Sequence, residues 1–136
     1  MSVLAIADTG FLYAYLDPGD QHHDWAREQF KQFSSFITCE AVLAEVSHLT
    51  GTRLNRPTLA LEMLALGVLE IAYTLHGDES EVLTLMSKYA DVPMDLADAC
   101  LVRMTEQHTA CELLTVDSDF LIYRRHGNQI IDVVTP

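Results

Sequence analysis

The sequence is poor in basic residues: eight Lys and Arg stand against twenty Asp and Glu in 136 residues, a formal net charge of −12. A chain this acidic repels nucleic acid at long range and has no broad positive surface for it. Any binding of a polyanion is therefore confined to a local site. The close pairs Arg53 with Arg56 and Arg124 with Arg125 are candidates for phosphate contacts, with solvated surface positions as the alternative.

Several other features are missing. No apolar run approaches the roughly 20 residues of a membrane helix, and the first residues lack the basic segment of a signal peptide, so we expect a cytoplasmic protein without a membrane span. The cysteines Cys39, Cys100 and Cys111 form no C-x-x-C pair and are expected to be buried free thiols. The histidines show no zinc-ligand spacing, and no Gly-rich phosphate loop is present.

What the sequence does contain is a regular alternation of strand and helix patterns in a chain that is 49% hydrophobic. We expect Asp20 to cap the helix predicted over 20–33 and Pro93 to lie in the first turn of the helix predicted over 94–108. Strands are predicted over 3–7, 35–38, 68–73, 112–116 and 129–134, and helices over 9–16, 20–33, 40–49, 58–66, 78–89, 94–108 and 118–124. Strands separated by helices predict one α/β domain over 1–136, an α/β/α sandwich around a central parallel sheet.

Four acidic residues lie inside or beside apolar segments. Asp8 and Asp117 each follow a predicted strand, Asp98 lies in the first turns of a predicted helix, and Glu45 is in the middle of another. Carboxylates are rarely buried without compensation, and a divalent cation supplies it. Ligands of parallel sheets bind at the carboxyl ends of the strands. We therefore predict that these acids converge there on one metal site.

Each residue of this site has a predicted role. Asp8, Asp98 and Asp117 are predicted metal ligands, and Glu45 either ligates metal or orients the attacking water. Thr9 and Thr115 are expected to fix the orientation of the carboxylates. The remaining two acids, Asp95 and Asp119, are either auxiliary site residues or structural ones.

A structural role is the alternative for each acid taken alone. Asp8 and Asp117 suit the N-cap position of the helix that follows each of them. Asp98 suits the positive end of a helix dipole, and Glu45 suits a solvated face or an ion pair. The prediction of a common site therefore depends on the four acids together.

The order and spacing of these segments resemble the PIN-domain nucleases, and among them the VapC-type toxins of prokaryotic toxin–antitoxin modules. The resemblance covers nearly the whole chain and rests on Asp8-Thr9-Gly10, Glu45 in its helix, Asp95-Leu96-Ala97-Asp98-Ala99 and Thr115-Val116-Asp117-Ser118-Asp119-Phe120. It implies an α/β/α fold, endoribonuclease activity with Mg²⁺ or Mn²⁺, an antitoxin protein that covers the site, and homodimers. Gly10 departs from the pattern, because Asn or Ser commonly follows Asp-Thr.

Two other classes of function stay open. One is a PIN-like module that binds RNA or protein without cleaving, which the acidic composition favours. The other is a receiver-like domain phosphorylated at Asp8. A receiver usually has a lysine at the end of a late strand, and this chain has only Lys31 and Lys88, neither of them so placed.

Overall fold

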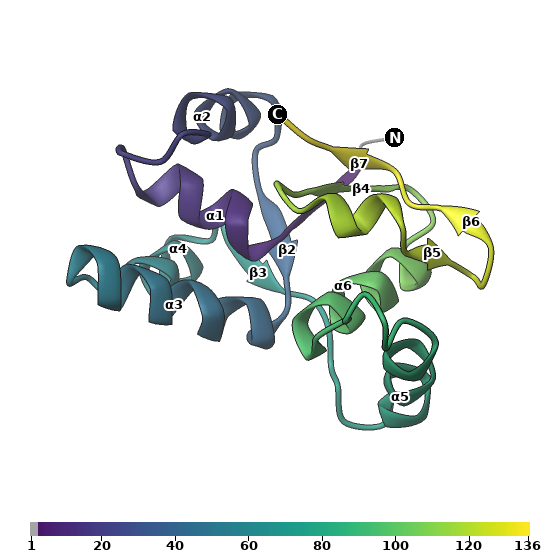
Figure 1. Cartoon of the computed structure of the whole chain (residues 1–136). Coiled ribbons are helices and arrows are strands. Elements are labelled where there is room, and N and C mark those ends of the chain that lie inside the picture. Colours follow the sequence, from purple (N-terminus) through teal and green to yellow (C-terminus); the bar gives the residue numbers. More distant parts are fainter. Residues whose placement is uncertain (1–2) are drawn as a thin grey trace.

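A parallel sheet of five strands, in the order β3-β2-β1-β4-β7, runs through the middle of the molecule (Figure 1). The computed structural model describes residues 3–136. Met1 and Ser2 belong to the predicted domain and to the segment considered as a signal peptide, and they lie outside the described residues. The strands are β1 Leu4–Ala7, β2 Phe36–Thr38, β3 Leu69–Ile71, β4 Cys111–Leu114 and β7 Val133–Val134. The predicted parallel sheet is confirmed. Within 3–136 no helix is long and apolar enough to cross a membrane.

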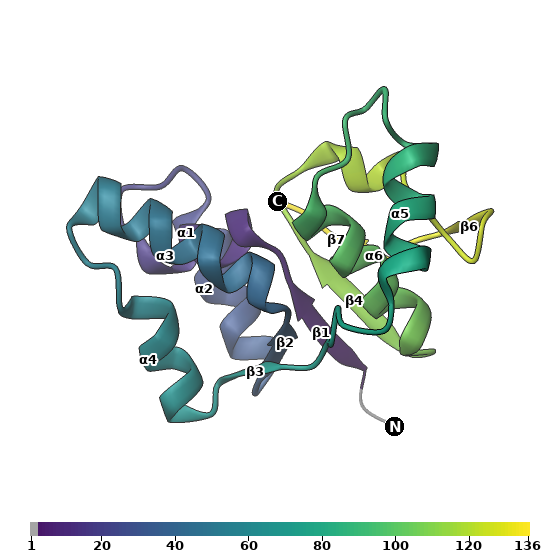
Figure 2. The same ribbon diagram turned by 90° about the horizontal axis from the view of Figure 1, so that it is seen from below.

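The helices form one layer on each face of the sheet (Figure 2). On one face lie α1 Thr9–Leu16, α2 His23–Gln32, α3 Glu40–Leu54 and α4 Leu59–Leu66; on the other lie α5 Glu79–Lys88 and α6 Leu96–Gln107. The chain steps from β1 to β2 to β3 in one direction and then returns past β1 to β4. Because such crossovers are right-handed, this reversal moves the connecting helices to the opposite face.

Aromatic side chains join the first helical layer to the sheet. Phe11 of α1 packs against Trp25 and Phe30 of α2 and against Phe36 of β2, with ring centroids 5.2–5.6 Å apart. Phe11 and Phe36 are fully buried. Offset and edge-on contacts of this kind stabilise a core beyond the area that they bury, so α1, and with it the end of β1, is held firmly.

Three predicted helix boundaries were wrong. α3 does not end near Gly51 but continues to Leu54, where Asn55 takes a left-handed conformation with φ 56°. α2 begins at His23, and Asp20 accepts a hydrogen bond from the His22 backbone N–H instead of capping the helix. α6 begins at Leu96 with Asp95 as its N-cap, so Pro93 lies before the helix.

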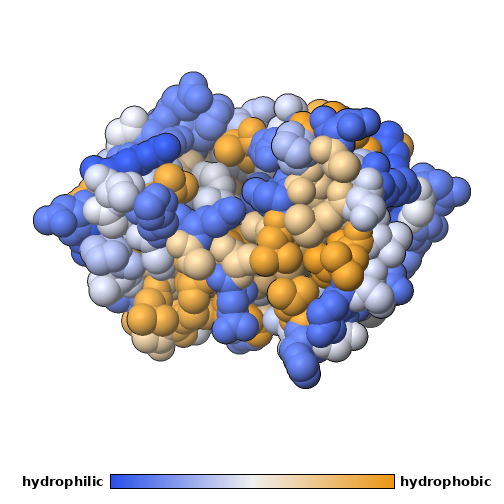
Figure 3. Space-filling view, turned by 60° about the horizontal axis from the view of Figure 1, so that its bottom comes forward, coloured by the Kyte–Doolittle hydropathy of each residue, from blue (hydrophilic) through white to orange (hydrophobic). Residues whose placement is uncertain are grey.

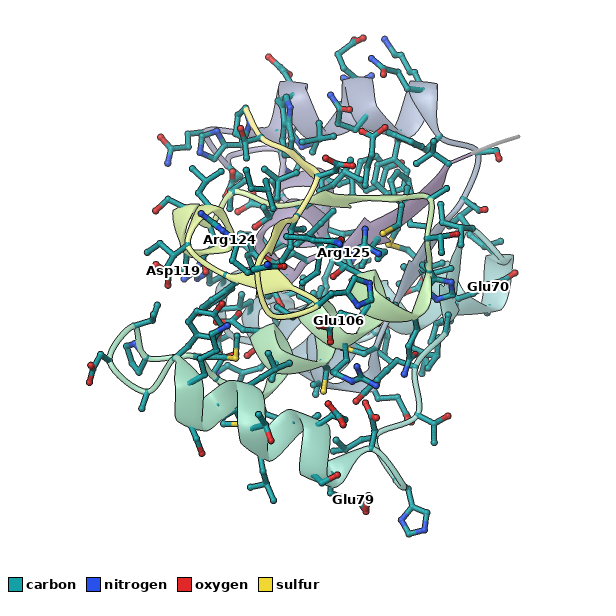
Figure 4. The ribbon with its side chains drawn as sticks, turned by 90° about the vertical axis from the view of Figure 1, so that its right-hand side faces the viewer. Glu70, Glu79, Glu106, Asp119, Arg124 and Arg125 are labelled. Atoms are coloured by element: carbon teal, nitrogen blue, oxygen red, sulfur yellow. The ribbon has the colours of Figure 1, made fainter. Side chains whose placement is uncertain are left out.

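The C-terminal segment also differs from its prediction. The helix predicted over 118–124 is a short 3₁₀ helix, η1 Ser118–Leu121, and the strand predicted over 129–134 is divided in two. Its first part, β6 Gln129–Ile130, pairs antiparallel with β5 Arg124–Arg125, and only β7 joins the main sheet. Arg124 and Arg125 lie on this hairpin, and Arg125 lies near Glu106 of α6 (Figure 4). Glu106 accepts a hydrogen bond of 2.6 Å from the His126 backbone N–H.

An ion-pair network holds α6 to the segment before α5. Arg103 of α6 donates to both carboxylate oxygens of Asp78, at 2.7 and 2.9 Å, and to Glu106 at 2.9 Å. Tyr73 donates a further hydrogen bond of 2.6 Å to Asp78. Bidentate pairs of this kind fix geometry as well as charge, so this network fixes α6 on its face of the sheet.

Gly10 marks a close approach between α1 and the loop after β4. A Cβ atom at Gly10 would overlap Cγ2 of Val116. Glycine is therefore required by packing, and it lets the residues that follow β1 and those that follow β4 lie side by side.

We expect Gly10→Ala to destabilise the protein by roughly 1–3 kcal/mol, because the new methyl group overpacks against Val116. In a Val116→Ala background the same change should be neutral or stabilising, since alanine favours the helix. Urea unfolding of the four proteins in this double-mutant cycle measures the coupling. Additive effects, within about 0.5 kcal/mol, would contradict the close contact.

Candidate active site

The four predicted site acids lie at the carboxyl edge of the sheet. Asp8 directly follows β1, and Asp117 follows β4, the strand beside it. α3, which carries Glu45, contacts α6, which carries Asp98, and both helices begin near this edge (Figure 1). The strand order reverses at β1, which is where parallel sheets bind their ligands.

Asp8 is the most deeply buried of the four, at 6% exposed. Its Oδ2 accepts a hydrogen bond of 2.6 Å from the Thr115 hydroxyl, and its Oδ1 accepts one of 2.7 Å from the Thr9 backbone N–H. Burial nevertheless raises its pKa to about 6, and the charges of Asp117 and Glu45 add to that shift. Asp8 therefore caps α1, as the structural alternative predicted, and it is also part of an acidic cluster; its role as a metal ligand stays a prediction.

Asp98, at 9% exposed, is the second buried carboxylate. The Tyr123 hydroxyl donates a hydrogen bond of 2.8 Å to its Oδ2, and its backbone N–H donates one of 2.8 Å to Asp95. Burial raises the pKa of Asp98 to about 7, opposed by the Tyr123 hydrogen bond and assisted by the charges of Asp95, Asp8 and Asp117. The two buried carboxylates thus repel each other and share Asp117 as a charged neighbour.

The other two acids are half-buried and hydrogen-bonded. Glu45 accepts a bond of 2.6 Å from the Thr9 hydroxyl. Asp117 caps η1 by accepting a bond of 2.9 Å from the Asp119 backbone N–H, and its own N–H donates to the Thr115 hydroxyl at 2.9 Å. Thr115 therefore connects Asp8 with the loop of Asp117. Each of the two threonines bonds a site carboxylate directly.

The remaining predicted residues have structural contacts. Asp95 is the N-cap of α6, which is the helix-terminus role that the sequence left open for it. Asp119 lies in the first turn of η1 and faces outward beside Arg124 (Figure 4). In this structure only its backbone, through the bond to Asp117, takes part in the cluster.

A cavity of about 460 Å³ lies beside the acidic cluster, and its lining is mainly apolar. It is lined by Thr9, Ala44, Glu45, His48 and Leu49. Figure 3 shows the molecule with the bottom of Figure 1 turned toward the viewer. On this face apolar patches lie next to hydrophilic side chains. A second cavity, of about 380 Å³, lies at the opposite edge, near the beginning of β1, and contains none of the four acids.

The donor set fits Mg²⁺ or Mn²⁺ in its chemistry. All the side-chain groups of the cluster are carboxylate or hydroxyl oxygens, which these ions prefer. Within residues 3–136 none of the four acids forms an ion pair, so their mutual repulsion is not neutralised by the chain itself. In the same part of the chain no three acidic, His or Cys side chains are grouped closely enough to hold one ion as they stand. Mg²⁺ needs only one or two carboxylates, because water supplies the rest of its shell.

Tyr123 is a site residue that the sequence did not reveal. It is fully buried between Tyr89 and Phe120, with ring centroids 5.1 Å from each, and its hydroxyl reaches Asp98. The sequence placed Tyr123 only within the helix predicted over 118–124. A buried tyrosine requires a hydrogen-bond partner, but nothing in the sequence identified Asp98 as that partner.

Comparisons with known proteins show the family and the fold of the chain. Residues 5–126 match the PIN domain family. The chain is 27% identical over 124 residues to Ribonuclease VapC26 of Mycobacterium tuberculosis. The aligned segment covers 89% of this chain and 87% of that protein. Its fold is similar to the crystal structure of Mycobacterium tuberculosis VapC20, described as a Sarcin-Ricin loop cleaving toxin. The TM-score is 0.75 at 19% identity, over 85% of this chain and 91% of that one.

The raised pKa values of Asp8 and Asp98 predict how stability depends on pH without metal. Between about pH 4 and pH 7 the folded protein keeps protons that the unfolded chain has released. The free energy of unfolding should therefore fall as pH rises through this window. Asp98→Asn should remove on the order of 3 kcal/mol of that fall, as measured by urea unfolding in EDTA. The exposed Asp91→Asn is the control, and equal slopes for wild type and Asp98→Asn would contradict the assignment.

We expect Tyr123→Phe to destabilise the metal-free protein by roughly 2 kcal/mol at pH 8, since a charged Asp98 loses its hydrogen bond. At pH 5, where Asp98 is protonated, the loss should be smaller. Tyr89→Phe is a matched control, because the Tyr89 hydroxyl accepts from the Arg124 backbone N–H and contacts no carboxylate. Urea unfolding at both pH values compares Tyr123→Phe with Tyr89→Phe. A loss of stability in Tyr123→Phe that does not change with pH would contradict a hydrogen bond from Tyr123 to charged Asp98.

Proposed function

This chain belongs to the PIN domain family, and we propose that it is a metal-dependent endoribonuclease, the toxin of a toxin–antitoxin pair. The observation that carries the proposal is the pair of buried carboxylates, Asp8 and Asp98, neither of which forms an ion pair within residues 3–136. A folded protein keeps so unfavourable an arrangement where a bound cation compensates it. The similarity to Ribonuclease VapC26 supports RNA as the substrate.

Asp8, Asp98 and Asp117 would hold the ion, with small movements of their side chains. When bound, Mg²⁺ or Mn²⁺ supplies positive charge to the scissile phosphate and lowers the pKa of its water. Thr115 and Tyr123 orient the two buried carboxylates through hydrogen bonds of 2.6 and 2.8 Å. Such neighbours limit the directions in which the two carboxylates can turn.

Glu45 is the residue that orients the attacking water. It is half-buried, it lines the cavity beside the cluster, and the Thr9 hydroxyl holds its Oε1 at 2.6 Å. The other oxygen stays available to accept a hydrogen bond from a water molecule. A carboxylate held in this way fixes the direction from which water approaches a phosphate bound beside it.

The toxin assignment implies a protein partner. A small antitoxin that covers the site would place a basic side chain among the acids and an apolar one in the cavity of about 460 Å³. Both features complement what this edge presents, namely uncompensated negative charge beside an apolar hollow. A homodimer and a cytoplasmic location stay predictions from the family resemblance.

A second candidate is a PIN-like module that binds RNA or protein without cleaving it. The formal net charge of −12 favours it, because a nuclease must attract a polyanion to its surface. The two proposals predict the same metal binding and differ only in turnover.

The deciding experiment is cleavage of a labelled structured RNA by the purified protein with Mg²⁺ or Mn²⁺, against EDTA. We expect metal-dependent cleavage that Asp98→Asn lowers by at least roughly 100-fold, while the exposed Asp91→Asn leaves it unchanged. Cleavage that persists in Asp98→Asn would contradict the assigned site. Metal that raises the melting temperature of wild type without any cleavage would favour the binding module.

A further inference from the structure

Two of the three cysteines meet beside the acidic site. Cys39 directly precedes α3, Cys100 lies in the second turn of α6, and both line the same cavity. Both are 2% exposed. The third cysteine, Cys111, is separate, and its thiol is directed at the His108 backbone carbonyl, 3.3 Å away. One pair of thiols is therefore in position to react together, and the other thiol is not.

A cavity lies beside this thiol pair. Cys39 and Cys100 line a common cavity of about 300 Å³ together with Glu40, Leu75 and Leu96. Glu40, Leu75 and Leu96 are exposed, so the cavity extends to the surface between α3 and α6. A peroxide molecule is little larger than water, and a cavity of this size admits it.

We propose that Cys39 and Cys100 form a modification site that hydroperoxides oxidise to a reversible disulfide between α3 and α6. One thiol attacks the peroxide, its sulfur takes one oxygen, and water leaves, which gives a sulfenic acid. The second thiol then attacks that sulfur, a second water leaves, and the S–S bond forms. Hydrogen peroxide accepts the two electrons that the sulfurs lose, and a dithiol reductant returns them.

The disulfide would act on the acidic site, a consequence that rests on the proposed function. An S–S bond of about 2.0 Å is much shorter than a non-bonded sulfur contact, so it draws the beginning of α3 toward α6. Asp98, one of the three proposed metal ligands, lies within one turn of Cys100 on α6. A shift of α6 toward α3 changes the distance from Asp98 to Asp8 and Asp117, so oxidation should weaken the binding of metal.

The test uses the full chain, reduced and then treated with hydrogen peroxide. We expect the intact mass to fall by two hydrogen atoms, a proteolytic peptide that links Cys39 to Cys100, and alkylation of Cys111 alone. Cys39→Ser and Cys100→Ser should abolish the link, while Cys111→Ser should retain it. Absence of the link, or a link through Cys111, would overturn the proposal. Because peptide mapping is done on the wild-type protein, this result does not depend on whether a variant folds.

Titration calorimetry with Mn²⁺ then tests the effect on the site. Oxidised wild type should bind Mn²⁺ roughly tenfold more weakly than the reduced protein, and dithiothreitol should restore the affinity. Equal affinities would overturn the coupling to the site. If the reduced protein binds no Mn²⁺ and cleaves no RNA, the proposed function fails, whereas peptide mapping still decides whether the disulfide forms.

Discussion

Repulsion among carboxylates that are buried at one edge of the sheet is the constraint on which the rest of this structure depends. Asp8 and Asp98 have lost most of their water, the charge of Asp117 acts on both, and the charge of Asp8 acts on Asp98. Hydrogen bonds are the compensation that the chain itself provides, and the side-chain donors come from distant parts of the sequence. Thr115 lies 107 residues from Asp8, and Tyr123 lies 25 residues from Asp98. The cluster can therefore exist only once the sheet and both helical layers have formed.

The strand order follows the same requirement. Thr115 reaches Asp8 because β4 pairs with β1, with Ala7 opposite Leu114 in the register. The loop after β4 must then pass close to the beginning of α1, and Gly10 is the residue that leaves room for Val116. In the family resemblance Gly10 looked like the loss of a polar group. In the structure it allows the close contact that brings the loops of Asp8 and Asp117 together.

Local signals in the sequence predicted the fold well, and contacts between distant elements limited the rest. The helix over 9–16 and the helix end at Gly67 were right because a cap and a left-handed glycine determine them locally. The predicted end of α3 was wrong. One glycine inside a helix costs about 1 kcal/mol, which is less than the stabilisation that the helix gains from packing against the rest of the protein. The four acids were predicted as site residues from their positions after strands and in helices, and that role stays a prediction. Tyr123 was missed, since only the folded chain brings it to Asp98.

The few cations of the chain explain why this site needs a charge from outside. Arg103 is held by Asp78 and Glu106, Arg125 is buried and donates to the His108 carbonyl, and Arg124 bonds three backbone carbonyls from Leu121 to Tyr123. These side chains stabilise the helices α5 and α6 and the hairpin of β5 and β6. An RNA phosphate brought to four uncompensated acids would meet repulsion alone. On the proposed function a cation must therefore be present before the phosphate can bind, so the affinity for RNA, and not only the rate of cleavage, depends on metal.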